Sequence, residues 1–471
     1  MEIKKSRGIE VNDAQSKLNS TWVNKVVRPE SVKEIQSWLE YALEGGYSVS
    51  VAGGRHAMGG QQFGTGTIHF DMSGFNKVNH IDIDRGIADI QSGIEWPELI
   101  TAIELQCQGT TPWGIRQKPT GVDKVSIGGC LSANIHGRGL SFPPFVDDVE
   151  SFSLLDASAK IRNCSREENR ELFSLVVGGY GLFGIILDVR LRLVSRTKVK
   201  RHVEVIKVVD LVDLVANRKE AGYLYGDCQY AIDLDGPAEE HLGVLSCYQP
   251  VDENAPIPPD QKSLSKESWK GLYQLARADK KAAFEVYAKY YMGTNDQIYW
   301  SDSHQLSSVF EGYMDAVKEH DGTEMITEVY VRKEDLNSFL ATVRADFIAN
   351  NADVTYGTIR FIEKDRESFL AWAKESWVCI VCNLHVVHSV KGIQKVKEDF
   401  GNLLDRVIEF GGCFYLTYHR WISREQVEAA YPQFNEFLKL KKKYDPSEVL
   451  QSDWYRYFKE MYSEDSSKIL D

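Results

Sequence analysis

Apolar and polar residues alternate in two short stretches near the start of the chain, and a glycine-rich segment separates them. Tyr47 to Val51 alternates as a half-buried strand does, and Thr67 to Met72 has the same character. Between them lies Val51-Ala-Gly-Gly-Arg-His-Ala-Met-Gly-Gly60. Its glycines leave backbone N–H groups accessible where side chains would cover them, which suits a pyrophosphate. The pattern predicts strand, phosphate-binding loop and strand.

Capping residues and periodicity predict the elements around this loop. Ser31 and Glu34 have capping-box spacing, and Gly45-Gly46 ends the helix that they open. By the same reasoning we expect a half-buried strand over 81–90, a turn and helix over 93–105, and a helix that Ser165 and Glu168 cap and that runs to Val177.

Beyond Arg196, helices and strands alternate without another glycine-rich phosphate loop, which is typical of a second α+β domain. We expect strands over 198–209, 328–331, 355–363 and 378–388, helical segments over 265–292 and 307–317, and a helix from near Lys333. With 471 residues the chain exceeds the roughly 250–300 residues of a single core. We predict a first domain over 1–196, a second over 197–425, and a C-terminal segment over 426–471.

Composition excludes several classes of function. A net charge of −13 argues against nucleic acid or an anionic membrane as a partner. Met1 to Leu18 is charged throughout, and no run reaches the roughly 18 apolar residues of a membrane helix, so we expect a cytoplasmic protein. The eight cysteines are scattered and are expected to be reduced. His385 and His388 would point to opposite faces of a strand, so we expect no metal site.

Three further segments accompany the glycine-rich loop. The stretch from Val125 to Gly139 is rich in small residues and ends in His136-Gly137-Arg-Gly. Gly179-x-Gly181-x-x-Gly184 fits the dinucleotide-binding expression, but it follows a helix and opens a strand, which excludes a Rossmann fold. Residues 412–421 read Gly-Cys-Phe-Tyr-Leu-Thr-Tyr-His-Arg-Trp.

Together these segments resemble the vanillyl-alcohol-oxidase (para-cresol-methylhydroxylase-type) flavoproteins, and are most similar to decaprenylphosphoryl-ribose oxidase and the alditol and aldonolactone oxidases. The resemblance implies an α+β fold in which a two-lobed FAD-binding domain lies under a cap domain, with an antiparallel sheet over the flavin. It implies FAD as the cofactor, either held non-covalently or bonded through His56 of Gly53-Gly-Arg-His. The alternative for His56 is a loop histidine that bonds a carbonyl group.

By resemblance, the residues that line the cofactor are Gly53, Gly54, Arg55, His56, Ala57, Met58, Gly59, Ser126, Gly128, Gly129, Asn134, Ile135, His136, Gly137, Gly179, Gly181, Gly184 and Ile186. A branched side chain before His136-Gly137, here Ile135, is expected to shield the ring from oxygen. This favours a dehydrogenase over an oxidase.

The resemblance also implies the reaction, which is oxidation of a CH–OH group of a sugar, sugar lactone or polyol by hydride transfer to flavin N5. The electron acceptor is oxygen or another molecule that the sequence does not identify. Two alternatives stay open: an FAD-dependent sugar 2′-oxidase that works as half of an epimerase with a partner reductase, and a non-catalytic flavin-binding protein.

We expect Tyr418, Arg360 and Glu363 on the substrate side. Arg360 occupies the strand where alditol oxidases carry a Glu-x-Arg pair, although Thr358 replaces the glutamate here. Tyr418 replaces a lysine of the decaprenylphosphoryl-ribose enzyme, and a nearby cation such as Arg420 would lower its pKa. The alternatives are a surface ion pair and a core tyrosine. If 412–421 is a strand, Tyr418 and His419 lie on opposite faces.

Overall fold

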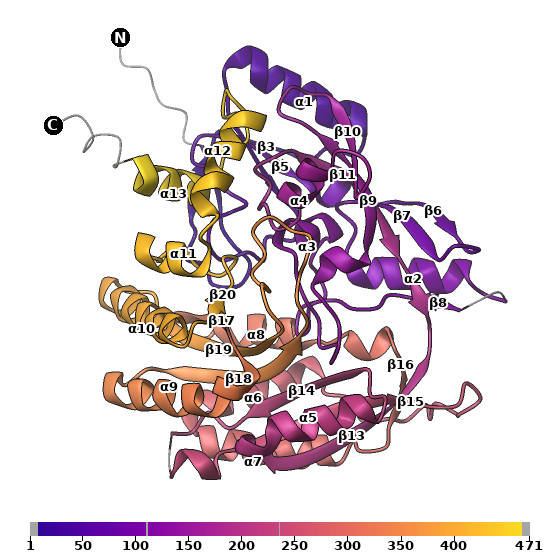
Figure 1. Ribbon diagram of the computed structural model, residues 1–471, viewed down its shortest axis with the longest axis vertical. Helices are drawn as coiled ribbons and strands as arrows, with labels where there is room; N and C mark the ends of the chain where they lie inside the picture. Colours follow the sequence, from indigo (N-terminus) through magenta and orange to yellow (C-terminus); the bar gives the residue numbers. More distant parts are fainter. Residues whose placement is uncertain (1–7, 110–111, 235, 464–471) are drawn as a thin grey trace.

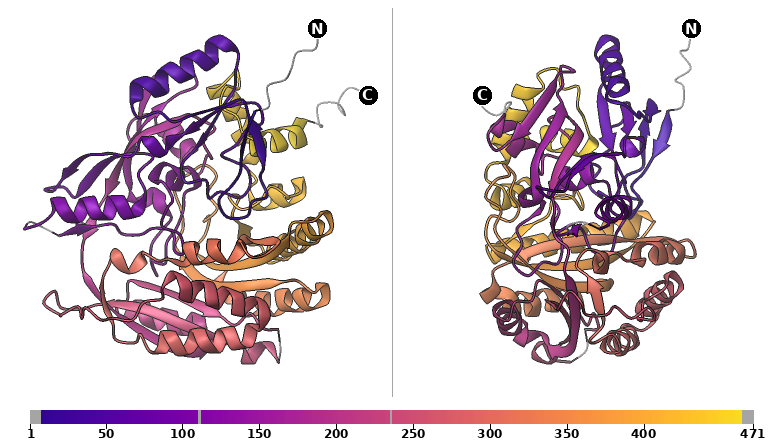
Figure 2. Two further views of the ribbon diagram at one scale, coloured as in Figure 1. Left: turned by 180° about the vertical axis from the view of Figure 1, so that it is seen from behind. Right: turned by 90° about the vertical axis from the view of Figure 1, so that its right-hand side faces the viewer.

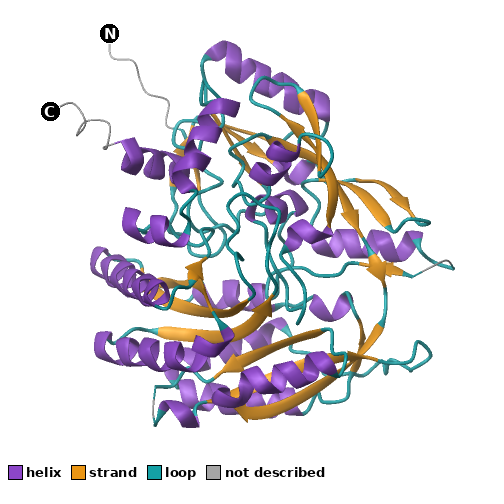
Figure 3. Cartoon of the chain, in the orientation of Figure 1, coloured by secondary structure: helices purple, strands orange, loops and turns teal. Residues whose placement is uncertain are grey.

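The computed structural model describes residues 8–109, 112–234 and 236–463 (Figure 1). Within these residues, strands β1 to β12 form four small sheets, and β13 to β20 form one sheet of eight strands. Helices surround both groups (Figure 3). The predicted mixture of helices and antiparallel sheets is therefore confirmed. Residues 1–7, part of the charged segment from Met1 to Leu18, lie outside the described residues.

The glycine-rich loop connects two strands of a small parallel sheet. Strand β4 (Val49–Ala52) precedes the loop, β5 (Ile68–Asp71) follows it, and β3 (Lys25–Val27) pairs with β5 on the other side. Helix α1 (Val32–Gly45) packs on this sheet through its apolar face. As predicted, the Ser31 hydroxyl accepts from the Glu34 N–H at 3.3 Å.

An antiparallel sheet of order β10-β9-β11-β7-β6 lies beside it. Its strands are β6 (Val78–Asp82), β7 (Ile87–Gln91), β9 (Val149–Leu155), β10 (Ile161–Ser165) and β11 (Ile185–Arg192). The neighbouring helices are α2 (Trp96–Gln106), α3 (Ile127–Ala133) and α4 (Arg170–Val176). Two short pairs, β1 (Ile9–Val11) with β2 (Thr21–Val23) and β8 (Trp113–Gly114) with β12 (Val194–Ser195), complete this half.

Two expectations for this half were wrong. The predicted single strand over 81–90 is a hairpin, because Gly86 adopts φ 64° and turns the chain between β6 and β7. Ser165 is not the N-cap of α4: its hydroxyl accepts from the N–H groups of Glu167 and Glu168 in a turn, and the helix begins after Asn169.

The eight-stranded sheet has the order β16-β13-β15-β14-β18-β19-β17-β20, and all of its pairings are antiparallel. Its strands are β13 (Lys198–Lys207), β14 (Tyr225–Tyr230), β15 (Leu242–Pro250), β16 (Ile298–Trp300), β17 (Gly322–Val331), β18 (Val354–Ile362), β19 (Trp377–Val387) and β20 (Cys413–Phe414). Two rows cross the centre of the sheet from β18 through β19 to β17. One row is Thr358, Val381 and Glu328, and the other is Arg360, Cys379 and Tyr330.

Helices cover this sheet. They are α5 (Leu211–Glu220), α6 (Lys266–Ala278), α7 (Lys280–Met292), α8 (Val309–Val317), α9 (Leu336–Asn350) and α10 (Val390–Glu409). The helical segment expected over 265–292 is two helices, because Asp279 adopts an extended conformation and caps the second. Helix α10 packs on β17 and β19, whereas α6 and α7 contact β18 and β13.

The last three helices, α11 (Arg424–Ala430), α12 (Phe434–Tyr444) and α13 (Asp453–Ser463), lie next to the N-terminal half (Figures 1 and 2). The chain after α12 extends β4: the Val49 N–H donates to the Val449 carbonyl at 2.6 Å, and the Gln451 N–H donates to the Val49 carbonyl at 2.7 Å. The proposed boundaries near residues 196 and 425 stay a prediction. No helix in the described part combines the length and apolar character needed to cross a bilayer.

Candidate active site

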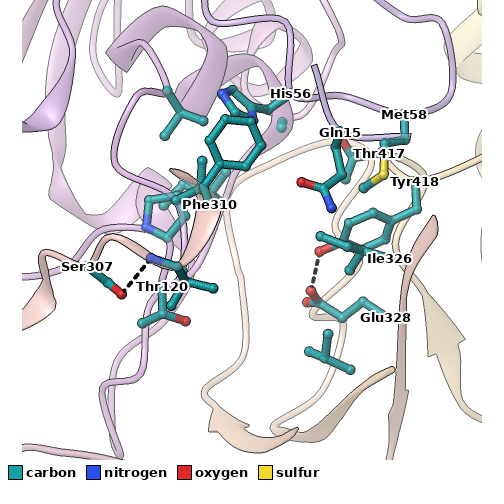
Figure 4. Close-up of a pocket in the computed structure, with 18 of the residues that line it drawn as sticks. Gln15, His56, Met58, Thr120, Ser307, Phe310, Ile326, Glu328, Thr417 and Tyr418 are labelled. Atoms are coloured by element: carbon teal, nitrogen blue, oxygen red, sulfur yellow. Dashed lines mark hydrogen bonds between the residues drawn. The ribbon is translucent and has the colours of Figure 1, made fainter. Parts of the chain in front are cut away.

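Residues of the glycine-rich loop, of α3 and of the eight-stranded sheet line one cavity of about 500 Å³. Helices α6 and α7 add an aromatic wall that includes Trp269, Phe284 and Tyr287. Figure 4 shows His56 and Phe310 on one side of this cavity and Glu328 and Tyr418 on the other. Loop and sheet therefore face a shared space large enough for a small organic ligand.

On its outer side, the glycine-rich loop is hydrogen-bonded to other segments of the protein. The Met58 N–H donates to the Thr417 carbonyl at 2.9 Å, and the Ala14 N–H donates to the Arg55 carbonyl at 2.8 Å. By contrast, within the described part of the chain the N–H groups of residues 54–57 donate no hydrogen bond to protein. These donors are available to the oxygen atoms of a ligand, as an anion-binding loop requires.

Glycine is needed here because the backbones approach closely. A Cβ atom at Gly53 would lie 1.8 Å from Ser126 Oγ, and one at Gly54 would lie 2.4 Å from the Lys124 carbonyl oxygen. At Gly128 it would lie 2.7 Å from Ser92 Cβ. The loop and the start of α3 thus form a cradle without side chains, beside which Gly181 and Gly184 also reach the cavity. Such a cradle fits a pyrophosphate-bearing cofactor.

Comparison with known families agrees with this geometry. Residues 23–165 match the family described as "FAD binding domain". This chain carries an FAD-binding domain. The match confirms the predicted resemblance over that segment, and it confirms FAD as the cofactor.

Several relatives match about a third of the chain. An uncharacterized oxidoreductase of Rhodococcoides fascians is 34% identical over 36% of this chain and 37% of its own length. Decaprenylphosphoryl-beta-D-ribose oxidase of Mycolicibacterium smegmatis is 30% identical over 31% of each chain. Mitochondrial L-galactono-1,4-lactone dehydrogenase of Arabidopsis thaliana is 28% identical over 32% of this chain and 24% of its own. The matched segments thus span about a third or less of these relatives.

The cradle yields a test of cofactor binding. A Gly53→Ala substitution places a methyl group against Ser126, and overpacking of this kind costs about 1–3 kcal/mol. We expect the FAD-binding domain to lose roughly tenfold or more in FAD affinity. This substitution and its control are both made in a His56→Ala background, in which the flavin cannot be bonded to residue 56, and the dissociation constant for FAD is measured after removal and re-addition of the cofactor. Gly271→Ala is the control, because an added Cβ at this site on α6 meets nothing within 4 Å; equal affinity in both variants contradicts the prediction.

Opposite the cradle, four side chains form a buried hydrogen-bonded cluster around Glu328. The Tyr418 hydroxyl donates to Glu328 Oε2 at 2.6 Å, and the Tyr330 hydroxyl donates to Oε1 at 2.5 Å. His136 Nε2 contacts the same Oε1, while its Nδ1 lies 2.9 Å from the Gly137 carbonyl oxygen. An ionised carboxylate and a carbonyl oxygen can only accept, so both ring nitrogens of His136 act as donors when Glu328 is ionised. The cluster is an imidazolium–carboxylate pair.

The charge of this pair sets the acidity of its members. Burial alone would raise the pKa of the Glu328 carboxyl, but the charge of His136 and the hydrogen bonds to the carboxylate lower it from 4.5 to about 2. Burial, followed by the charge of Glu328, raises the pKa of Tyr418 well above 10. Tyr418 is therefore a neutral phenol that donates one hydrogen bond and presents its oxygen lone pairs as acceptors.

His136, Glu328 and Cys379 also bring three potential metal ligands within 4.8 Å of one another, in the described part of the chain. The chemistry does not favour a metal. Burial raises the pKa of the Cys379 thiol well above its ordinary value, so it is not a thiolate. The imidazole nitrogen and the carboxylate already bond each other. We interpret the group as a polar cluster of the active site.

The structure brings most of the predicted residues to the cavity. Those that line it are Gly53, Gly54, Arg55, His56, Ala57, Met58, Ser126, Gly128, Gly129, Ile135, His136, Gly181, Gly184, Ile186, Arg360 and Tyr418. Gly59, Asn134, Gly137, Gly179 and Glu363 do not. Asn134 instead ends α3 with φ 50°, and its amide donates to Asp365 Oδ2 at 2.9 Å. The assignment of individual residues to the cofactor stays a proposal.

Three expectations about the substrate side need correction. Glu363 lies outside the cavity, where it pairs with Lys219 at 2.7 Å and accepts from Ser376 at 2.6 Å, not with Arg360. Residues 415–418 form a turn rather than a strand, so strand alternation does not explain why Tyr418 faces the cavity. The cation that acts to lower the pKa of Tyr418 is Arg360, not Arg420, and burial and the charge of Glu328 outweigh it. The guanidinium of Arg420 donates to the Gly59 carbonyl at 3.4 Å.

The sequence reasoning missed Glu328, which organises the whole cluster. The residue was visible only as the start of a predicted strand, Glu328-Val-Tyr-Val. A glutamate that shares a strand face with a tyrosine, two residues apart inside an apolar run, was the available signal. It also missed Asp227, Arg138 and Tyr356, which line the cavity as well.

Proposed function

We propose that this protein is an FAD-dependent oxidoreductase that oxidises a CH–OH group of a sugar, sugar lactone or polyol. The observation that carries the proposal is the Tyr418–Glu328–His136 cluster, which faces the FAD cradle across the cavity. Two relatives support the substrate class, since their names refer to a galactonolactone and to a decaprenylphosphoryl ribose. When bound, FAD supplies the acceptor for a hydride.

The cluster can accept the proton that the substrate hydroxyl loses. Tyr418 can accept a hydrogen bond from the substrate hydroxyl, because its own proton is already donated to Glu328. As the carbinol carbon loses a hydride, its oxygen becomes that of a protonated carbonyl, a much stronger acid than a carboxylic acid. Even a carboxylate with a pKa of about 2 can then receive the proton, relayed through Tyr418. The contacts of His136, Tyr330 and Tyr418 hold Glu328 ionised before the reaction.

Anaerobic photometric titration tests the function. The purified protein is mixed with a sugar, a sugar lactone and a polyol, and the flavin absorbance near 450 nm is followed. We expect bleaching with at least one of them. If none bleaches the flavin while dithionite does, the proposed reaction is refuted. A released keto-sugar that only a partner reductase consumes would instead select the epimerase alternative.

The expectation that Ile135 slows the reaction of the reduced flavin with oxygen stays a proposal. The side chain of Ile135 lines the cavity.

His56 is our proposed attachment point for FAD. Its ring lies on the cradle side of the cavity, 4.7 Å from the ring of Phe310. Burial, and then the neighbouring charges of Arg55 and Lys17, lower the pKa of His56 to about 4, so the imidazole is neutral and nucleophilic at neutral pH. In acid precipitation, we expect the yellow colour in the pellet for the wild type and in the supernatant for His56→Ala. A colourless wild-type pellet would show that FAD is held without a bond.

A further inference from the structure

Arg360 is a buried cation that forms no ion pair or hydrogen bond with the described residues. Its side chain projects from the middle of β18 into the cavity, and the residue is only 8% exposed. Its Nε is buried without a hydrogen bond, and the guanidinium forms no ion pair or hydrogen bond with any other described residue. A buried charge that lacks a counter-charge is costly, and an arginine presents a planar fork of donors that matches an oxyanion.

The acids of the cavity are already engaged elsewhere. Asp227 Oδ1 lies 3.6 Å from Arg138 Nη1, and Glu328 is paired with His136. Neither forms an ion pair with Arg360. The cavity therefore holds a surplus of positive charge in its sheet wall.

A second arginine in this wall also lacks an acidic partner. Arg201 donates to the Tyr248 hydroxyl at 2.9 and 2.6 Å and to Thr294 Oγ1 at 3.0 Å, and it forms no ion pair in the described part of the chain. In addition, Arg138 keeps a buried Nε without a partner. Since the free N–H groups that suit the FAD pyrophosphate belong to the glycine-rich loop, this surplus on the sheet is directed at a different ligand.

We propose that Arg360 anchors an oxyanion subsite and that the substrate is a sugar derivative that carries a carboxylate or a phosphate. The assignment to a substrate rests on the proposed function. Arg360 and Glu328 sit on strands separated by one other strand, β19, and Arg360 lies two residues along from the row that holds Glu328, so their backbones are roughly 12 Å apart. The anionic group would thus lie several bonds from the carbon whose hydroxyl meets Tyr418. A six-carbon sugar with an oxyanion at one end and the reacting carbon at the other fits this separation.

Isothermal titration of the FAD-loaded protein with three matched probes tests the subsite. The probes are glucose, glucuronate and glucose 6-phosphate, which differ only in the group at one end. We expect one or both anions to bind roughly tenfold or more tightly than glucose, as charge-assisted hydrogen bonds predict. A preference between the two anions identifies carboxylate or phosphate.

Variants assign the effect to Arg360. Arg360→Met is expected to abolish the preference for the anions, and Arg360→Lys to keep part of it, because the charge remains but the fork is lost. The control is Arg406→Met, which removes an arginine outside the cavity that is paired with Asp346 and Glu409. FAD content should be unchanged in all three; loss of FAD from Arg360→Met would show that this arginine serves the cofactor and would overturn the inference.

Equal affinity for the three probes, no binding of either anion, or wild-type anion binding by Arg360→Met would also overturn it. Flavin reduction is measured separately, so the two proposals can fail independently. Reduction by neutral sugars without any anion preference would leave the oxidoreductase and remove the subsite. Arg360-dependent anion binding, with no reduction by any sugar, lactone, polyol or sugar acid, would keep the subsite and remove the proposed reaction.

Discussion

Tyr418→Phe is expected to slow flavin reduction by substrate roughly 10²–10⁴-fold, the range that general acid–base groups contribute. The phenyl ring keeps the packing, but the hydroxyl that connects the cavity to Glu328 is lost. The alcohol proton then has no acceptor next to the reacting carbon. The measurement is anaerobic stopped-flow at 450 nm under saturating substrate. FAD content should stay at the wild-type level, since Tyr418 lies across the cavity from the cradle (Figure 4).

Tyr330→Phe is the matched control for this prediction. Tyr330 also donates to Glu328, but it does not line the cavity. Removing its hydroxyl perturbs the same carboxylate without touching the substrate path, so the rate should fall by less than roughly tenfold. Equal losses in the two variants would mean that the hydroxyls act only by holding Glu328, and the relay through Tyr418 would be wrong.

Glu328→Gln is expected to destabilise the protein by about 3 kcal/mol or more at pH 7. One pKa unit is worth about 1.4 kcal/mol, and the pKa of Glu328 is lowered from 4.5 to about 2. Because the pKa is lower in the folded state, this stabilisation is fully present above about pH 4.5 and disappears as the pH falls toward 2. The amide also leaves the His136 imidazolium without a counter-charge, and breaking such a buried pair costs about 3–5 kcal/mol.

Urea unfolding at pH 7, 4.5 and 3 measures the difference between Glu328→Gln and the wild type. The difference should be largest at pH 7 and shrink at pH 3. The control is Glu375→Gln, whose pair with Arg332 is half-exposed and is worth about 1 kcal/mol or less. A constant difference from pH 7 to 3 would refute the ionised state of Glu328 in the folded protein.

Local signals in the sequence were enough to predict parts of the N-terminal half. The strands around residues 53–60 and the cap at Ser31 depend on neighbours within a few positions, and the structure has both. Some wrong predictions also came from local patterns. The alternation over 81–90 continues through a two-strand hairpin because residues on both sides of Gly86 keep the same face buried, so periodicity alone could not reveal the turn.

The substrate side could not be predicted in the same way, because its contacts join distant segments. Glu328 meets His136 across 192 positions and Tyr418 across 90. The register of β18, β19 and β17 places Glu328 in the same row as Thr358, the position at which the family resemblance expects a carboxylate. A carboxylate is thus present in this row, but it belongs to Glu328 on β17 and not to residue 358 on β18. The spacing of residues along the sequence gives no sign that the carboxylate comes from a different strand.

The hydrogen bonds between the glycine-rich loop and the C-terminal segment have a consequence for when FAD can bind during synthesis of the chain. Met58 is bonded to Thr417, Gln61 Nε2 donates to the Leu416 carbonyl at 2.6 Å, and Val49 pairs with Leu450. Contacts between such remote segments form late in folding. During synthesis on the ribosome, a nascent chain that ends before Thr417 lacks these anchors, although it already contains the whole FAD-binding domain match. Stable loading with FAD is therefore expected only after the C-terminal helices have emerged.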